Sequence, residues 1–344
     1  MRRMYKLLLT LSLVTANIII TSVTIIFWPS NISNPSSEGC LFTFAQITDS
    51  QFTGSSPIFE TTTKWLSEQN NLAFVVHTGD IVNSPFNEAT WKNAYVYIHQ
   101  LDNRCSWATL AGDDDIPRGN TILTNYQKYF GNSSLDQYYI IGGKLLFVLL
   151  SWSNVDGSIS KERLEWMDKV IQDHMDLKVI VCLHPCLSNL PILNMMAAPN
   201  TDEIWNHIDK HENIILTLNG HMHKNWIIIH NNGSNKVWSI STEALFDKGY
   251  TRIFYVYKDR IEATAYSPWT NTTYTGPLDR FTINYNSTNN DADRDLWNDN
   301  IDIMPTHPLV PNSIITSITI IVAIILFMTH NKRLPNKKNQ NNQK

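Results

Sequence analysis

The sequence predicts an α/β fold, a four-layer αββα sandwich in which two stacked mixed β-sheets are flanked by helices. From residue 41 to about residue 222, short apolar runs typical of strands alternate with segments of helical periodicity. After His223 the pattern changes to antiparallel hairpins. An alternating α/β part followed by hairpins fits two packed sheets covered by helices. Apolar runs near both ends add predicted N- and C-terminal membrane helices.

Five apolar runs are expected to be strands, and each is followed by residues that can bind a metal ion. The runs are residues 41–47, 72–76, 107–110, 179–183 and 214–218. The segments that follow them are Asp49-Ser50-Gln51, Gly79-Asp80, Gly112-Asp113-Asp114-Asp115, His184-Pro185 and Gly220-His221-Met222-His223. Open α/β sheets bind ligands beyond the carboxyl ends of their strands, so these side chains should converge at one edge.

Helices and hairpins are expected between and after these strands. Residues 57–68 and 87–101 have helical patterns that separate the first three strands, and residues 160–175 precede the fourth. Ser160 suits the N-cap of that last helix, whose apolar residues are spaced for one buried face. The predicted hairpins join residues 226–230 to 237–240 and residues 252–257 to 260–266.

The two ends of the chain predict attachment to a membrane. Residues 1–28 hold a long apolar run behind basic residues, which favours an uncleaved signal anchor, with a cleaved signal peptide as the alternative. Residues 312–329 are expected to form a C-terminal transmembrane helix, followed by a basic cytoplasmic tail at 330–344. Residues 286–311 are rich in Asn, Asp and Pro and predict a stalk, which leaves residues 40–285 as one large domain.

Charge and sequons indicate on which side of the membrane the domain lies. Basic residues flank both apolar runs on their outer sides, so both termini are expected in the cytoplasm if the N-terminal segment is uncleaved. The domain would then be extracellular or lumenal at a cell membrane, with the lipid bilayer as a partner of the terminal helices. Five sequons, which predict a glycoprotein, begin at Asn31, Asn132, Asn232, Asn271 and Asn286.

The composition argues against one class of partner, and it does not decide how the cysteines pair. The net charge is −4 and the middle of the chain has no basic block, so no nucleic-acid partner is expected. The four cysteines could pair in an oxidising compartment, and the sequence does not choose among the three full pairings.

The ordered acidic and histidine segments suit hydrolysis of a phosphate ester. That reaction needs a nucleophile at neutral pH and neutralisation of the phosphoryl charge, and two divalent ions about 3.5–4 Å apart supply both. Such a pair needs one carboxylate that can bridge, and Asp80 is the candidate. Mixed oxygen and nitrogen ligands favour Mn, Fe, Zn or Ni over calcium, and the sequence does not choose among them.

The same segments resemble the calcineurin-like metallophosphoesterase superfamily, whose motifs are D-x-H, G-D, G-N-H-[DE], a single His and G-H-x-H. The resemblance covers residues 41–268 and implies two metal ions in a two-sheet sandwich domain. Carried over by position, the first ion would be held by Asp49, Asp80 and His223. The second would be held by Asp80, Asp113, His184 and His221.

The chain departs from this pattern in two of the motifs. Gln51 stands at the usual His of the first motif, where its amide oxygen can bind a metal ion more weakly than imidazole. Asp113 replaces the Asn of the third motif and can still be a ligand, although it adds a negative charge. Asp114 replaces the His that in relatives contacts phosphate and assists the leaving group, and an ionised carboxylate cannot donate a proton. Arg118 is near enough in sequence to bind substrate and offset that charge, or it is a solvated loop residue.

The sequence therefore predicts a membrane-anchored, externally facing phosphoesterase that hydrolyses phosphate mono- or diesters through a metal-bridging hydroxide. Asp80 and Asp114 occupy the catalytic positions. The alternative is a surface binding protein that keeps the fold and the metal site but has weakened catalysis. Of the remaining histidines, His77 is expected to be structural, whereas His207 and His211 are expected at the surface.

Overall fold

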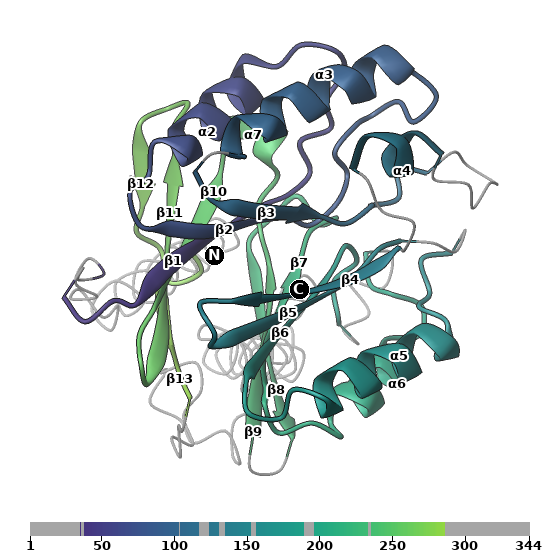
Figure 1. The fold of residues 1–344 in the computed structure, drawn as a ribbon, viewed down its shortest axis with the longest axis vertical. Helices are drawn as coiled ribbons and strands as arrows, with labels where there is room; N and C mark the ends of the chain where they lie inside the picture. Colours follow the sequence, from purple (N-terminus) through teal and green to yellow (C-terminus); the bar gives the residue numbers. More distant parts are fainter. Residues whose placement is uncertain are drawn as a thin grey trace, which may run out of the picture. The chain divides into compact units, whose positions relative to one another are not determined.

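The computed structural model describes residues 35, 38–102, 104–116, 124–130, 135–152, 156–188, 196–232 and 235–285. Residues Ile32–Thr288 form one compact unit (Figure 1). The predicted anchor or signal peptide (1–28), stalk (286–311), C-terminal membrane helix (312–329) and tail (330–344) lie outside the described residues. Within the described part of the chain, no helix is both long enough and apolar enough to cross a membrane.

The first sheet has seven strands and contains the strands that precede the acidic segments. Its strands are β1 (Phe42–Ile47), β2 (Leu72–His77), β3 (Ser106–Thr109), β10 (Thr251–Val256), β11 (Arg260–Ser267), β12 (Thr272–Tyr274) and β13 (Phe281–Asn284). They follow the order β12-β11-β10-β1-β2-β3, with β13 also paired to β11. The pairs β1–β2 and β2–β3 are parallel, whereas β10 joins β1 antiparallel, so the sheet is mixed.

The second sheet has six strands and contains the strands that precede the histidine segments. Its strands are β4 (Asp136–Ile141), β5 (Leu145–Leu150), β6 (Lys178–Leu183), β7 (Ile214–Asn219), β8 (Trp226–Asn232) and β9 (Asn235–Ser241). Their order is β4-β5-β6-β7-β9-β8. The four central strands are parallel and the edge strands β4 and β8 are antiparallel, so this sheet is mixed as well.

Helices cover the outer face of each sheet, which completes the four layers (Figure 1). On the first sheet they are α2 (Pro57–Ser67), α3 (Glu88–Ile98) with the 3-10 turn η1 (His99–Leu101), α4 (Thr124–Phe130) and α7 (Leu245–Lys248). On the second sheet they are α5 (Lys161–Gln172) and α6 (Thr201–Ile208). One apolar cluster fills the space between each sheet and its helices. The predicted αββα sandwich of two mixed sheets is therefore confirmed for the described residues.

Aromatic side chains join the two sheets face to face. Phe147 of β5 lies 5.0 Å from Phe44 of β1 and 4.7 Å from Phe74 of β2, measured between ring centroids. Phe44 also stacks on Phe254 of β10 at 4.5 Å. All four rings are fully buried, so this cluster fixes how one sheet lies on the other.

Most predicted elements appear within one or two residues of their expected limits. The five strands that precede the ligand segments, the three helices and the two hairpins are all present. Ser160 occupies the N-cap of α5, but its side chain accepts no hydrogen bond from the helix backbone. Strands β4 and β5 were not predicted. Every residue of β5 is buried, and a short apolar run of this kind has no alternation that would distinguish a strand from a helix.

The aromatic contact between the sheets leads to a stability prediction. Replacing Phe147 with Ala should lower the free energy of unfolding by about 3–5 kcal/mol, because it removes a buried ring that contacts the other sheet. Tyr138→Ala is the control, because Tyr138 is 47% exposed on the edge strand β4, and its loss should cost less than about 1 kcal/mol. Urea unfolding followed by tryptophan fluorescence measures both, and equal losses would contradict the proposed sheet contact.

Candidate metal centre

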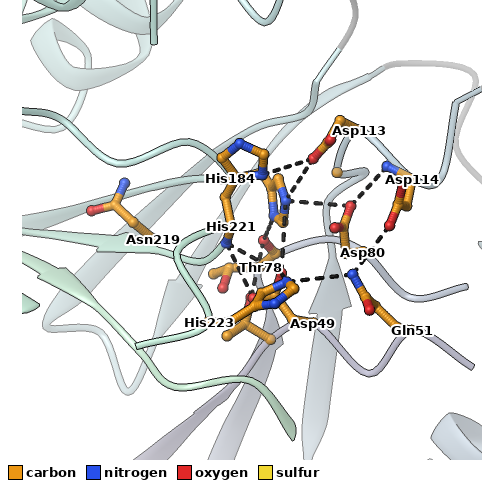
Figure 2. Close-up of polar contacts among 12 residues, drawn as sticks. Asp49, Gln51, Thr78, Asp80, Asp113, Asp114, His184, Asn219, His221 and His223 are labelled. Atoms are coloured by element: carbon orange, nitrogen blue, oxygen red, sulfur yellow. Dashed lines mark hydrogen bonds and ion pairs between the residues drawn. The ribbon is translucent and has the colours of Figure 1, made fainter. Parts of the chain in front are cut away.

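The ligand segments meet where strands of both sheets end (Figure 2). Asp49, Asp80 and Asp113 follow β1, β2 and β3 of the first sheet. The histidines follow β6 and β7 of the second sheet. Carboxylates from one sheet therefore face imidazoles from the other.

Short distances join these side chains into two groups. His184 Nε2 lies 3.3 Å from Asp80 Oδ1 and 3.1 Å from Asp113 Oδ1. His221 Nδ1 lies 2.9 Å from the same Asp113 oxygen, and His223 Nε2 lies 3.2 Å from Asp49 Oδ1. Within each of two groups, the atoms that could bind a metal ion lie within 4.8 Å of one another. The groups are Asp49, Asp80 and His223, and Asp80, Asp113, His184 and His221.

Two buried polar atoms of this cluster lack hydrogen bonds and are placed as ligands of a metal ion would be. His184 Nε2 and Asp113 Oδ1 are both buried, and neither makes a hydrogen bond despite their closeness. The other ring nitrogen of His184 lies 2.7 Å from the carbonyl oxygen of Thr78 and donates its proton there. This contact leaves the Nε2 lone pair available, as in histidines that bind metals. Both atoms are therefore placed as ligands of a common ion would be.

The backbone is strained at the same positions. Among the described residues, six non-glycine residues have a positive φ angle, and all but Asn271 belong to the centre. The five are Asp49 (50°), Gln51 (38°), Asp80 (55°), His221 (65°) and His223 (53°). Left-handed backbone at such residues costs on the order of 1–3 kcal/mol each and is typical of functional sites. The fold therefore holds these side chains in place at an energetic cost.

Two glycines allow the loops that carry the ligand residues to approach one another closely. A Cβ atom on Gly112 would lie 2.1 Å from Asp80 Oδ1 and 2.4 Å from the Asp80 backbone nitrogen. A Cβ atom on Gly220 would lie 2.1 Å from Thr48 Oγ1 and 2.7 Å from Asp49 Oδ2. Both positions exclude any side chain, which explains the glycine that precedes Asp113 and the glycine that precedes His221.

Electrostatics within the cluster favour charged pairs. Burial by itself raises the pKa of Asp49, but hydrogen bonding to His223 and the charge of His184 outweigh it and lower the pKa. The pKa of Asp113 is lowered in the same way by its two histidine partners, against the effect of burial. Burial lowers the pKa of His184, yet the charge of Asp80 and the close approach of the Asp113 carboxylate raise it well above its usual value. A divalent ion can take the place of these shared protons, so metal binding should release protons.

A carboxylate that the sequence did not single out as important supports the loop of Asp80. Asp115 accepts hydrogen bonds from the backbone N–H groups of Ile81 (3.1 Å), Val82 (3.0 Å) and Gly112 (2.9 Å). Burial and the neighbouring charge of Asp80 raise the pKa of Asp115 to about 8. Asp115 therefore positions the loops that carry Asp80 and Asp113, and it belongs to neither group of ligand atoms.

Two aromatic rings flank the centre, and no sequence signal identified either. Trp152, after β5, lies 5.5 Å from the ring of His221 and 6.0 Å from that of His184. Phe246 of α7 lies 5.2 Å from the ring of His223 and is 40% exposed. Both rings come from segments far from the ligands in the sequence, which is why only the fold reveals them.

Two of the residues that depart from the family pattern, Gln51 and Asp114, contact each other. Gln51 Nε2 donates to Asp114 Oδ2 at 3.1 Å and lies 3.3 Å from His223 Nε2. The Asp114 backbone N–H donates to Asp80 Oδ1 at 2.9 Å. Gln51 thus presents its amide nitrogen to the centre, and a half-turn of the amide would present the predicted ligand oxygen. Arg118 lies outside the described residues.

The remaining histidines and the cysteines belong to neither group of ligand atoms. His77 is buried and hydrogen bonded to Ser50 Oγ at 2.9 Å, and burial lowers its pKa to about 3, so it is structural. The expectation that His207 and His211 lie at the surface was wrong, because both are buried and paired with Asp168 between helices α5 and α6. The four cysteines, all within the described residues, are free thiols.

Two known proteins are similar in sequence to parts of this chain. No protein-family model matches the chain. Uncharacterized protein YvnB of Bacillus subtilis (strain 168) is 26% identical over 261 residues, which are 67% of this chain and 20% of YvnB. A manganese-dependent ADP-ribose/CDP-alcohol diphosphatase of Arabidopsis thaliana is 31% identical over 80 residues, 23% of this chain and 26% of that enzyme. The chain thus matches only about a fifth to a quarter of the length of these relatives.

A solved structure decides the fold. A dimetal phosphatase from Danio rerio superposes with a TM-score of 0.54 at 16% identity, covering 72% of this chain and 99% of that structure. This chain has the calcineurin-like metallophosphoesterase fold. The resemblance drawn from the ligand segments is therefore confirmed at the level of the fold.

The close approach at Gly112 gives a testable consequence. Gly112→Ala should displace Asp80, whose carboxylate belongs to both ligand groups, and therefore reduce the metal content of the purified protein for both ions. Gly143→Asn is the control: Gly143 has φ of +60°, which Asn tolerates, and a Cβ there has no neighbour within 4 Å. Elemental analysis measures both variants, and a Gly112→Ala protein with its full metal content would contradict this role.

Proposed function

We propose that this protein is a phosphoesterase that uses two divalent metal ions to hydrolyse phosphate mono- or diesters. The observation that carries the proposal is a single buried carboxylate, Asp80, which is shared by two groups of ligand atoms, each drawn from both sheets. Two neighbouring sites with a common carboxylate are what a two-metal centre requires. The dimetal phosphatase that shares this fold and the manganese-dependent diphosphatase similarity support the same reaction class.

The chain's own residues would hold and orient the centre. Asp49, Asp80 and His223 would hold one ion, with Gln51 beside it, and Asp80, Asp113, His184 and His221 would hold the other. When bound, two divalent ions of Mn, Fe, Zn or Ni type supply a nucleophile at neutral pH and neutralise phosphoryl charge. Thr78 fixes the ring of His184, and Asp115 fixes the loop that carries Asp80. Both contacts reduce the reorganisation needed when substrate binds.

Asp114 stands beside the centre where a proton donor would be useful. Its carboxylate accepts from Gln51 and its backbone nitrogen donates to Asp80. A carboxylate that two divalent ions keep ionised cannot protonate a leaving group, so substrates with acidic leaving groups should react best. The same observation favours a second candidate function, a surface binding protein that keeps the fold and the metal ions without efficient turnover.

Membrane attachment is part of the proposal. The apolar runs at residues 7–28 and 314–328, with basic residues on their outer sides, support anchoring at a cell membrane with the domain extracellular or lumenal. Both termini would then be cytoplasmic, provided that the N-terminal segment stays uncleaved. Arg118 remains a proposed substrate contact on sequence grounds alone.

The metal centre is tested by removing the shared carboxylate. The purified protein should carry about two transition ions per chain, and Asp80→Ala should lose both, with a fall of about 100-fold or more in hydrolysis of 4-nitrophenyl esters. His223→Ala should mainly weaken one ion, whereas His174→Ala, an imidazole that contacts the backbone of α5, should weaken neither. Metal-loaded protein that hydrolyses no phosphate ester would favour the binding protein, and unchanged metal content in Asp80→Ala would refute the assignment.

Topology is tested independently of catalysis. With tags on both termini, protease added to intact cells should digest residues 40–285 and spare both tags, because the membrane shields the cytoplasmic ends. Detergent should expose the tags and serves as the control. A domain protected in intact cells would end the extracellular or lumenal proposal.

A further inference from the structure

We infer that two buried amides, Gln46 and Asn219, are positioning residues that set the geometry of the metal centre. The inference rests on the two-metal centre of the proposed function and names residues that hold its ligands in place. Both side chains are completely buried. Both lie next to segments that carry ligands, and their hydrogen bonds join those segments to one another.

Asn219 joins the segments that carry His184 and His221. It is the last residue of β7, two positions before His221, and its side chain points away from the carboxylates (Figure 2). Asn219 Nδ2 donates to the carbonyl oxygen of Pro185, the residue after His184, at 2.9 Å. A carbonyl oxygen only accepts, so the amide nitrogen must be the atom that faces it. The rings of His184 and His221 lie 5.1 Å apart, and this hydrogen bond ties together the strand ends that carry them.

Gln46 joins the same strand end to the other sheet. From β1, its Nε2 donates to the carbonyl oxygen of Asn219 and to Thr78 Oγ1, both at 3.0 Å. Thr78 lies two positions before Asp80, and its carbonyl oxygen accepts the hydrogen bond from His184. Gln46 therefore links the segment of the shared carboxylate to the end of β7, across the space between the sheets.

A buried arginine supports Gln46 in turn. Thr242 Oγ1 donates to Gln46 Oε1 at 2.7 Å and accepts from Arg252 Nε at 3.1 Å. Arg252 is completely buried, and its Nη2 donates to Asn225 Oδ1 at 2.8 Å. Asn225 lies two positions after His223. The network thus reaches the last of the histidine segments as well.

The layer between the sheets changes from aromatic to polar side chains toward the metal centre. Gln46 lies on the same face of β1 as Phe44, because side chains two positions apart in a strand point the same way. A buried amide costs free energy unless its polar atoms are bonded. Thr217 and Ser239 hydroxyl groups donate to the Asn219 side-chain oxygen at 3.2 and 3.1 Å and meet that demand. Bonded polar groups at this end of the layer can orient ligands, which an apolar side chain cannot do.

The first test replaces Asn219 with Leu, which has the same branched shape but no donor. In the full-length protein, the Kd of manganese at one of the two sites should rise by about tenfold or more, because His184 and His221 lose their support. Asn213→Leu is the matched control: Asn213 is a buried amide at the opposite end of β7, and its Nδ2 donates to the carbonyl oxygen of Leu177 at 3.0 Å. Calorimetric titration should find both of its Kd values within about twofold of wild type.

The second test concerns Gln46, which contacts the segment of the carboxylate that both ions share. Gln46→Met should therefore raise the Kd of both ions by about tenfold or more. Thr242→Val, which removes only the hydroxyl group that donates to Gln46, is the milder variant should the methionine protein fail to fold. It should raise both Kd values by about threefold or more. Its control is Thr63→Val, because the buried Thr63 hydroxyl donates within α2 to the carbonyl oxygen of Phe59 at 3.0 Å, and both Kd values should stay within about twofold of wild type.

Electron paramagnetic resonance gives a readout that a loss of stability alone does not change. With both sites saturated with manganese, the wild-type protein should show the spectrum of two coupled ions. Asn219→Leu should change that coupling, because the imidazoles that hold one ion have moved. Asn213→Leu should keep the wild-type spectrum, even at an equal loss in melting temperature.

The outcomes separate this inference from the proposed function. Wild-type protein that binds two ions but hydrolyses no phosphate ester overturns the proposed function alone, because the metal affinities still test the amides. Unchanged Kd values and spectra in both Asn219→Leu and Thr242→Val overturn the inference alone. Equal losses of affinity in Asn219→Leu and Asn213→Leu also overturn it, since they would report a general effect on the fold. Wild-type protein that binds fewer than two ions overturns both.

Discussion

The structure depends on one constraint: carboxylates at the strand ends of one sheet must meet imidazoles at the strand ends of the other. Asp80 Oδ1 and His184 Nε2, 3.3 Å apart, represent that contact. Neither sheet holds a complete ligand group, so the stacking of the sheets is what creates the centre. The buried cluster of Phe44, Phe74 and Phe147 therefore supports function as well as stability, because it fixes the distance between the layers.

Strain and close contact at the centre are the energetic cost of this arrangement. Five site residues have positive φ angles, and at Gly112 and Gly220 the backbone approaches its neighbours too closely for a side chain. Well-packed strands around the centre hold this strained backbone in place. Unpaired buried atoms such as His184 Nε2 add a further cost that a bound ion would relieve. Metal binding should consequently stabilise the fold, since it offsets costs that the protein alone bears.

Electrostatics distinguish this centre from the pattern that it resembles. Gln51 and Asp114, two of the three residues that depart from the pattern, are partners in one hydrogen bond, so we regard them as a single change in the lining of the site. That change exchanges a potential proton donor for a negative charge. We expect the consequence to be a dependence on good leaving groups, because an ionised carboxylate cannot protonate the departing oxygen.

The sequence by itself determined the ligand segments, their order, the five strands that precede them and three of the helices, because these depend on local chemistry: apolar runs, turn glycines and the spacing of His221 and His223. Tertiary structure alone decided which side chains meet. It placed Asp115 on the backbone of the Asp80 loop, brought Trp152 and Phe246 beside the histidines, and paired Gln51 with Asp114 across 63 positions. It also buried His207 and His211, whose surroundings come from α5 and not from their own segment. Such contacts join residues far apart in the chain, so no local pattern encodes them, and only the packing of the two sheets with their helices brings them together.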